Sequence, residues 1–163
     1  MMDSTFTAEE HFRQGLEALH DERPKNAARH FAAATRLDSG SARFRSYYGL
    51  ALGLAERRLE RALELCREAV KQEFFDPVHY HNLARLHLAF GFKAEAIRYL
   101  RRGLMIDPEN REISEHMQEL GVRRPPPLGF LRRQNVLNRW AGRLLRRNRL
   151  EPDMEFTAFG AQA

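Results

Sequence analysis

Histidine is the residue type in this sequence with the widest chemical range, because its imidazole can bind a metal ion or transfer a proton near neutral pH. The chain holds seven histidines, and three of them, His79, His81 and His87, fall on one predicted helix. Side chains two positions apart on a helix diverge by about 200°, and a spacing of six does not match the i, i+4 spacing of a helical metal pair. No cysteine or carboxylate cluster completes a ligand set around them. The sequence therefore predicts no metal site and no bound cofactor.

The second reactive residue type is cysteine, of which the chain has one, Cys66. Phe31 and Leu100 stand 35 residues before it and 34 residues after it, at equivalent points of a repeated pattern. A position shared with Phe and Leu predicts a buried, unreactive thiol. The spacing shows no Gly-rich phosphate loop, no paired acid and base, and no nucleophile beside a base. We therefore expect a protein that is not an enzyme and has no small-molecule substrate.

Arginine supplies the most concentrated charge, near the C-terminal end of the sequence. Residues 1–120 carry 18 Lys and Arg against 19 Asp and Glu, whereas residues 121–150 carry nine arginines and no acidic residue. Residues 135–150 sort on a helical wheel into a basic side and an apolar side, which predicts a basic amphipathic helix. The apolar side consists of Val136, Leu137, Trp140, Ala141, Leu144 and Leu145. The candidate residues for contact with a membrane surface or RNA are Arg132, Arg133, Arg139, Trp140, Arg143, Arg146 and Arg147.

The apolar side of this predicted helix needs a cover, because soluble monomers rarely expose apolar patches of several hundred Å². We expect the chain's own helices to provide it, since a short connector keeps the segment at a high effective concentration. A partner protein or an anionic surface could then displace it. Three uses of the segment stay open: packing on the rest of the chain, lying on an anionic membrane, and approaching RNA.

The elements that position these residues follow from an internal repeat. Four series of mostly small residues recur at 34 or 35 residues and share one register. They are Gly15, Gly49 and Ala84; Ala27, Ala62 and Ala96; Phe31, Cys66 and Leu100; and Ala34, Ala69 and Gly103. Within each unit the pattern places small residues where two helices cross closely and a larger residue between neighbouring units. The sequence therefore predicts three antiparallel helix hairpins, with one inserted residue near positions 56–58.

The repeat resembles the tetratricopeptide-repeat (TPR) family, whose 34-residue unit carries Leu-Gly-x2-aromatic, Ala-x3-Phe and a closing Pro. The third unit matches best, with Leu83-Ala84, then Ala96-x3-Leu100, and finally Pro108. The resemblance covers about residues 8–110. It implies an all-α solenoid whose concave groove, lined mainly by the first helix of each unit, binds a peptide or helix of another protein.

The register of that implied groove selects candidate binding residues from each unit. The candidates are Phe12, Arg13, Leu16, Arg43, Tyr47, Leu50, Leu54, Val78, His81, Asn82 and Arg85. The TPR subclass that clamps a C-terminal carboxylate needs Lys and Asn in this groove. Apolar residues stand at most of the corresponding places, so we reject that mode and expect an apolar ligand segment with acidic flanks.

The rest of the chain divides at a predicted cap helix. Asn110 is a suitable N-cap for a helix to Leu120, which Gly121 terminates, with Ile113, Met117 and Leu120 on one face. We thus expect a TPR solenoid with a cap helix over 1–121, a Pro/Arg connector over 122–134, the basic amphipathic helix over 135–150, and a flexible tail over 151–163.

These features predict an interaction adaptor in the cytoplasm that binds a protein of unknown identity. The alternative is a peripheral membrane or RNA-associated adaptor acting through the arginine-rich segment. The single cysteine, the missing signal-peptide pattern and the absence of a run of about 20 apolar residues underlie the expected location.

Overall fold

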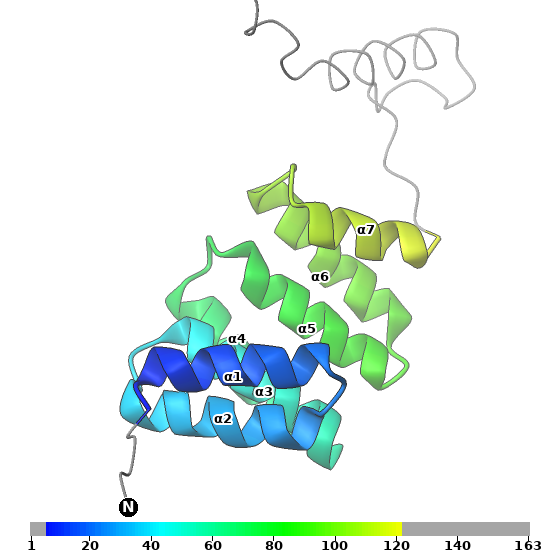
Figure 1. The fold of residues 1–163 in the computed structure, drawn as a ribbon. Coiled ribbons are helices and arrows are strands. Elements are labelled where there is room, and N and C mark those ends of the chain that lie inside the picture. The colour runs from blue at the N-terminus through cyan, green and yellow to red at the C-terminus, as the bar shows by residue number, and fades with distance from the viewer. Residues whose placement is uncertain (1–5, 122–163) are drawn as a thin grey trace, which may run out of the picture. The chain divides into compact units, whose positions relative to one another are not determined.

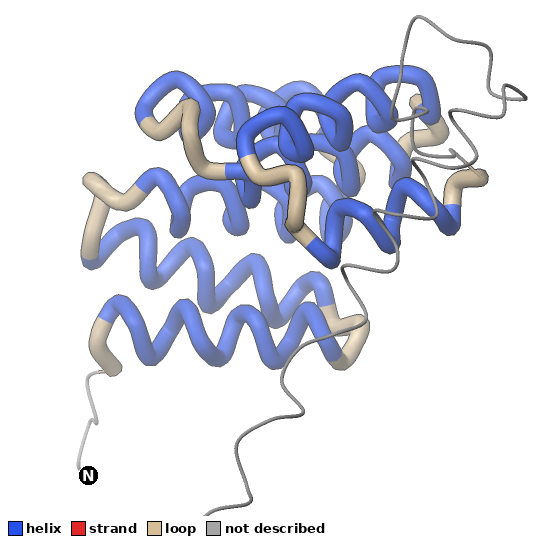
Figure 2. The backbone as a smooth tube through the Cα atoms, turned by 90° about the horizontal axis from the view of Figure 1, so that it is seen from above, coloured by secondary structure: helices blue, strands red, loops and turns tan. Residues whose placement is uncertain are grey.

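The computed structural model describes residues 6–121, and every regular element in this range is an α-helix. Six helices form three antiparallel hairpins, and a seventh follows them (Figure 1). Their bounds are α1 Ala8–His20, α2 Pro24–Leu37, α3 Ala42–Glu56, α4 Leu59–Gln72, α5 Pro77–Ala89, α6 Lys93–Ile106 and α7 Arg111–Glu119. Figure 2 shows the helices side by side, joined by short turns. The predicted all-α hairpin solenoid is therefore confirmed for this range.

The first helix of each hairpin begins at a polar residue that caps it. The Thr7 hydroxyl accepts a hydrogen bond from the Glu10 N–H, while the Glu10 carboxylate accepts one from the Thr7 N–H. The Ser41 hydroxyl caps α3 by accepting from the Phe44 N–H, and the Asp76 carboxylate caps α5 by accepting from the Val78 N–H. Each cap pairs an N–H group that the first turn of a helix leaves free. The caps thus fix where each repeat unit starts.

The second unit accommodates its inserted residue by lengthening a helix. Helix α3 has 15 residues, whereas α1 and α5 have 13 each. The turn that follows is shorter than its counterparts and contains Arg57 in the left-handed conformation, with φ of 58°. The Arg57 N–H donates to the Gly53 carbonyl oxygen at 3.1 Å, which closes the end of α3.

Small residues lie where the two helices of a hairpin cross, as the repeat predicts. A Cβ atom placed on Gly15 would come 2.5 Å from the Phe31 ring, and one on Gly49 would come 2.8 Å from the Ala62 carbonyl oxygen. Both distances are too short for real contacts. The repeat therefore uses glycine at these positions because the neighbouring helix fills the space.

Helix α7 covers the outer side of the third hairpin. The Asn110 side chain accepts a hydrogen bond from the Ile113 N–H at 3.1 Å, and Gly121 adopts φ of 74° just beyond the helix. Ile113 and Met117 are buried. The expected cap helix is confirmed. The predicted connector, basic helix and C-terminal tail lie outside the described residues.

Candidate functional site

Helices α1 and α3 bring aromatic side chains together on the face predicted to bind a partner. The rings of Phe12 and Tyr47 lie 5.1 Å apart, edge to face, and Phe44 lies 4.9 Å from Phe12. The guanidinium carbon of Arg43 stands 4.5 Å from the centre of the Phe12 ring. A cation over an aromatic face is attracted by the negative charge of the ring face. Phe12 and Phe44 are buried, so this end of the site presents part of the Tyr47 ring and the positive charge of Arg43 to solvent.

Helices α5 and α7 meet through two histidines on the same side of the molecule. The His81 Nε2 atom lies 3.1 Å from His116 Nδ1, and His81 Nδ1 lies 3.6 Å from the Glu112 carboxylate. Burial, aided by the positive charges of Arg85 and His116, lowers the pKa of His81 to about 4. Glu112 is largely exposed, so water screens most of its opposing effect. The His81 ring is therefore neutral at neutral pH.

Between these two groups lies Arg85 of α5, which is partly buried. Its pKa is lowered by burial, while the nearby side chains of Tyr47 and Glu112 favour its charged form. Burial also raises the pKa of Tyr47. Within residues 6–121 the Arg85 guanidinium makes no hydrogen bond and no ion pair. A partly desolvated cation without such a partner is ready to accept an anionic group.

We name the surface around Arg43, Tyr47, His81 and Arg85, to which α1, α3, α5 and α7 contribute, the first-helix face. Of the predicted binding residues, Arg13 and Arg43 are exposed. Those that are partly buried, and so keep some surface for a ligand, are Leu16, Tyr47, Leu54, Val78, His81 and Arg85.

The other three predicted binding residues, Phe12, Leu50 and Asn82, are buried, and their assignment to a free surface is corrected here. Leu50 is 0% exposed and packs in the cluster that contains Leu83 and Leu86. The Asn82 amide donates to the Ser46 hydroxyl at 3.1 Å. These side chains hold neighbouring repeats together because each first helix packs against the next one in the stack as well as facing a ligand.

Cys66 lies in the position predicted for it. Its side chain is 0% exposed, and its thiol donates to the Ser46 carbonyl oxygen at 3.3 Å. Burial raises its pKa to about 12, so the reactive thiolate does not form at neutral pH. The expectation of a buried, unreactive thiol is confirmed.

Sequence reasoning missed a group of side chains at the turn between α4 and α5. Glu73, Asp76 and His79 place one ligand atom each within 4.8 Å of one another. The expectation that no carboxylates complete a set around His79 is therefore wrong. Because Glu73 and Asp76 lie in a turn between two repeats, a search along the helix of His79 does not find them. The spacing Glu-x2-Asp-x2-His at the start of a helix is the signal that points to them.

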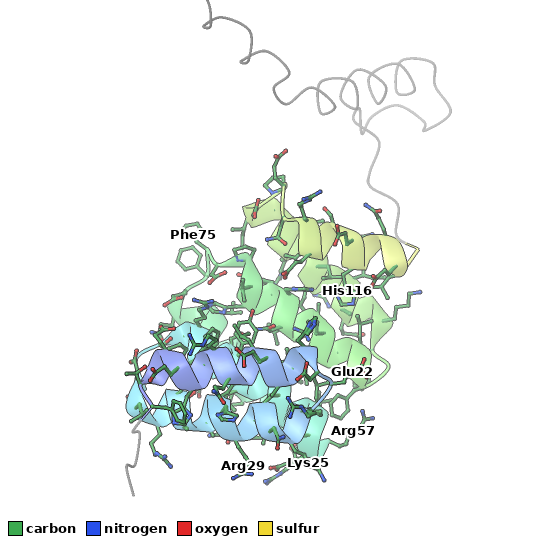
Figure 3. The ribbon with its side chains drawn as sticks, in the orientation of Figure 1. Glu22, Lys25, Arg29, Arg57, Phe75 and His116 are labelled. Atoms are coloured by element: carbon green, nitrogen blue, oxygen red, sulfur yellow. The ribbon has the colours of Figure 1, made fainter. Side chains whose placement is uncertain are left out.

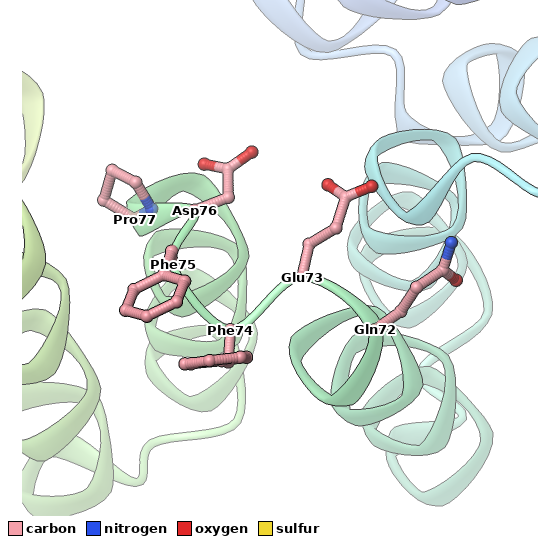
Figure 4. A pocket seen from close by; sticks show the side chains of 6 residues that line it. All are labelled: Gln72, Glu73, Phe74, Phe75, Asp76 and Pro77. Carbon is pink, nitrogen blue, oxygen red and sulfur yellow. The ribbon is translucent and has the colours of Figure 1, made fainter.

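The same turn carries a surface pocket lined by Gln72, Glu73, Phe74, Phe75, Asp76 and Pro77 (Figure 4). The carboxylates of Glu73 and Asp76 lie on one side of the turn, and the two phenylalanine rings lie on the other (Figure 4). Phe74 and Phe75 are 55% and 73% exposed. Figure 3 shows Phe75 at the end of the hairpins opposite Arg57. This turn thus combines two carboxylates with two exposed aromatic rings.

Solved structures share this arrangement of helices. An Arabidopsis OM64 TPR domain matches 69% of this chain and 93% of its own, with a TM-score of 0.55 and 18% sequence identity. The chain has the tetratricopeptide-repeat fold. A chain from the structure of Naa15/Naa10 bound to HypK-THB matches 85% of the present chain at a TM-score of 0.63 and 20% identity, although the match spans 20% of that chain. A chain of the CopN–Scc3 complex matches 76% of this chain and 80% of its own, with a TM-score of 0.51 and 14% sequence identity.

No protein-family model matches the chain, and no curated protein matches it. The TPR assignment therefore rests on the fold and on the repeat pattern. Among residues 6–121, no helix is long and apolar enough to cross a membrane.

Proposed function

We propose that this TPR chain is a non-catalytic adaptor that binds a segment of another protein on the first-helix face. The observation that carries the proposal is Arg85, a partly buried guanidinium that has no hydrogen-bonding partner among the described residues and lies beside Tyr47. A carboxylate of the partner would restore the interactions that burial removes from this cation. The arginine thus specifies an acidic residue in the bound segment.

The rest of the face specifies the apolar part of that segment. Leu16, Leu54 and Val78 are partly buried apolar side chains, and Tyr47 adds an aromatic ring with a hydroxyl group. A segment with apolar residues spaced for one side of a helix or strand would cover them. The TPR-fold chains from Naa15/Naa10 bound to HypK-THB and from the CopN–Scc3 complex come from assemblies of proteins, which supports a role in binding proteins.

The proposal is tested by selecting ligands for the full-length chain from a phage-displayed library of random peptides. We expect the selected peptides to combine apolar residues with at least one Asp or Glu. The variant Arg85→Gln should bind them on the order of ten to a hundred times more weakly, since a hydrogen bond to a charged group contributes about 1.5–3 kcal/mol. Isothermal titration calorimetry measures the difference.

The matched control is Arg29→Gln, because Arg29 is exposed on α2, away from the first-helix face (Figure 3). This variant should bind the selected peptides as the parent does, and both variants should unfold at the parent temperature. Peptides without acidic residues, or equal binding by the parent and Arg85→Gln, would contradict the proposal.

The arginine-rich segment supports a second function, in which the chain attaches to an anionic membrane or to RNA. The observation in its favour is the run of nine arginines without an acidic residue over 121–150. Flotation with anionic vesicles and salt-dependent RNA binding separate these two possibilities. This function and the cytoplasmic location both remain predictions.

A further inference from the structure

The turn between α4 and α5 brings three donor atoms of a metal-binding type to one point. They are one carboxylate oxygen each from Glu73 and Asp76, and the Nε2 atom of His79. Glu73 follows the last residue of α4, whereas Asp76 is the N-cap of α5 and His79 lies in its first turn. The group therefore joins the second helix hairpin to the third.

The separations of these atoms are longer than good hydrogen bonds, and one of them matches the spacing of two ligands on a common metal ion. His79 Nε2 lies 3.4 Å from the nearer Glu73 oxygen and 3.9 Å from Asp76 Oδ2. Good N–H···O hydrogen bonds span roughly 2.7–3.2 Å. Two ligands bonded at about 2.0–2.1 Å to a tetrahedral zinc ion stand about 3.4 Å apart. The His79–Glu73 separation equals that spacing, and all three atoms lie within 4.8 Å of one another.

The backbone of the turn holds the ligands in place without a metal ion. The Asp76 N–H donates to the Glu73 carbonyl oxygen at 3.3 Å, and the Tyr80 hydroxyl donates to the Phe74 carbonyl oxygen at 3.1 Å. Asp76 uses its Oδ1 atom to accept from the Val78 N–H at 2.8 Å. Its Oδ2 atom is the one directed toward His79. Capping and metal binding thus use different oxygens of one carboxylate.

The His79 ring is aimed at the carboxylates and has lost its contact with water. Its side chain is 0% exposed, and its Nδ1 atom has no hydrogen-bond partner among the described residues. Nε2 is the nitrogen that faces Glu73 and Asp76, and a metal ion bound there would replace its proton and leave the proton of the ring on Nδ1. Glu73 and Asp76 are 47% and 32% exposed, which leaves a route from solvent to the site.

We propose that Glu73, Asp76 and His79 bind a divalent transition-metal ion, with zinc as the best match to one imidazole and two carboxylates. Water would complete the coordination from the exposed side. The ion would link the residue after α4 to the first turn of α5 and so fix the angle between the second and third repeats. The proposal does not depend on the first-helix face, and either could fail alone.

The test is calorimetric titration of zinc chloride into the full-length chain after treatment with a chelator. We expect one zinc ion per chain at this site. Glu73→Gln and Asp76→Asn should each weaken zinc binding by more than about tenfold. Removing a residue that only hydrogen-bonds a metal ligand already costs about 10–100-fold, and these changes alter the ligands themselves. Both changes keep side-chain shape, and Asn caps helices as well as Asp does, so unfolding temperatures in chelator should match the parent.

Two other histidine pairs supply the controls, because histidine nitrogens also come close at His11–His30, at 3.3 Å, and at His81–His116, at 3.1 Å. His30→Gln and His116→Gln should bind zinc as the parent does. Imidazole ¹⁵N spectra should show the Nε2 signal of His79 shifting on addition of zinc. Absence of zinc binding in the parent, binding unchanged by Glu73→Gln and Asp76→Asn, or a loss confined to His30→Gln or His116→Gln would overturn the proposal.

Discussion

At the scale of single residues, the amide of Asn82 shows how closely surface and core alternate on a first helix. Asn82 is 1% exposed and donates to Ser46, which is 0% exposed. We expect Asn82→Ala to lower the free energy of unfolding by about 1–3 kcal/mol, because the buried Ser46 hydroxyl loses its partner. Urea unfolding measures this. Asn26→Ala, at an exposed position of α2, should change the stability little, and equal effects of the two would count against the buried hydrogen bond.

The partly buried His81 ring makes stability depend on pH. Its pKa falls from an ordinary 6.5 to about 4 in the folded chain, so between these pH values the unfolded chain binds more protons. The contribution of the neutral His81 ring to the free energy of unfolding is therefore fully present above pH 6.5 and declines as the pH is lowered toward 4. The pKa values of His30, His87 and His116 are also lowered by burial, and act in the same direction.

The expected loss from His81 across this window is about 3 kcal/mol at most, from the size of the pKa change. Unfolding midpoints in urea between pH 7 and pH 4.5 measure it. His81→Gln should show a shallower decline than the parent. A parent whose stability is constant over this range would refute the assignment of a neutral buried ring.

Single residues were predicted well where the repeat constrains them and poorly where two surfaces share one helix. The burial of Cys66 followed from its equivalence to Phe31 and Leu100. The burial of Leu50 and Asn82 did not, because the groove register marks the side of the helix that faces a ligand but not how far the adjacent helix extends over it. Burial here depends on tertiary packing, which the pattern of one helix does not contain.

At the scale of helices, the close crossing of α3 and α4 depends on Gly49. An added methyl group would meet the Ala62 carbonyl oxygen at 2.8 Å and the Cys66 sulfur at 2.7 Å. Because a backbone carbonyl inside a helix cannot move away, we expect Gly49→Ala to cost about 1–3 kcal/mol of stability. Thermal unfolding followed by circular dichroism measures the loss. Gly40→Ala serves as the control, since among the described residues the only atom near its added Cβ is a side-chain oxygen of Asp38, at 3.3 Å. A stabilised Gly49→Ala variant would show that the helices lie farther apart.

Helices were the best-predicted level, since the small residues that mark each crossing also fix the hairpin register. The inserted residue of the second unit was placed near its turn, and the structure shows it as a longer α3. The side-chain contacts within the turns were harder to predict from the sequence. The group of Glu73, Asp76 and His79 forms because a turn and the start of the next helix fold back on each other, and the repeat markers carry no information about that turn.

At the scale of the whole molecule, the repeat predicted the hairpin solenoid, and Asn110 and Gly121 predicted its cap helix, but a binding partner leaves no such signal. The fold supports many kinds of ligand, so function follows from particular groups such as Arg85 and not from the architecture. The arginine-rich segment has its own pattern, and its predicted helix lies outside the described residues.

Helix α7 closes the C-terminal end of the folded unit. Residues up to Gly121 form one compact unit, and α7 closes it, with Ile113 1% and Met117 6% exposed. The Ile113 side chain fills the space above Gly103, where an added Cβ would come within 2.6 Å. A chain of residues 1–121 should therefore unfold cooperatively.

A chain of residues 1–107 lacks α7 and should lose about 3 kcal/mol or more, because burying each of two large apolar side chains contributes about 1.5–3 kcal/mol. Thermal unfolding of the two shortened chains beside the full-length protein measures the difference. Ile113→Ala in the full-length chain provides an internal comparison, and its loss of stability should be smaller than that of the chain of residues 1–107. If residues 1–107 unfolded at the same temperature as residues 1–121, α7 would be an appendage on a solenoid that is already closed by α6.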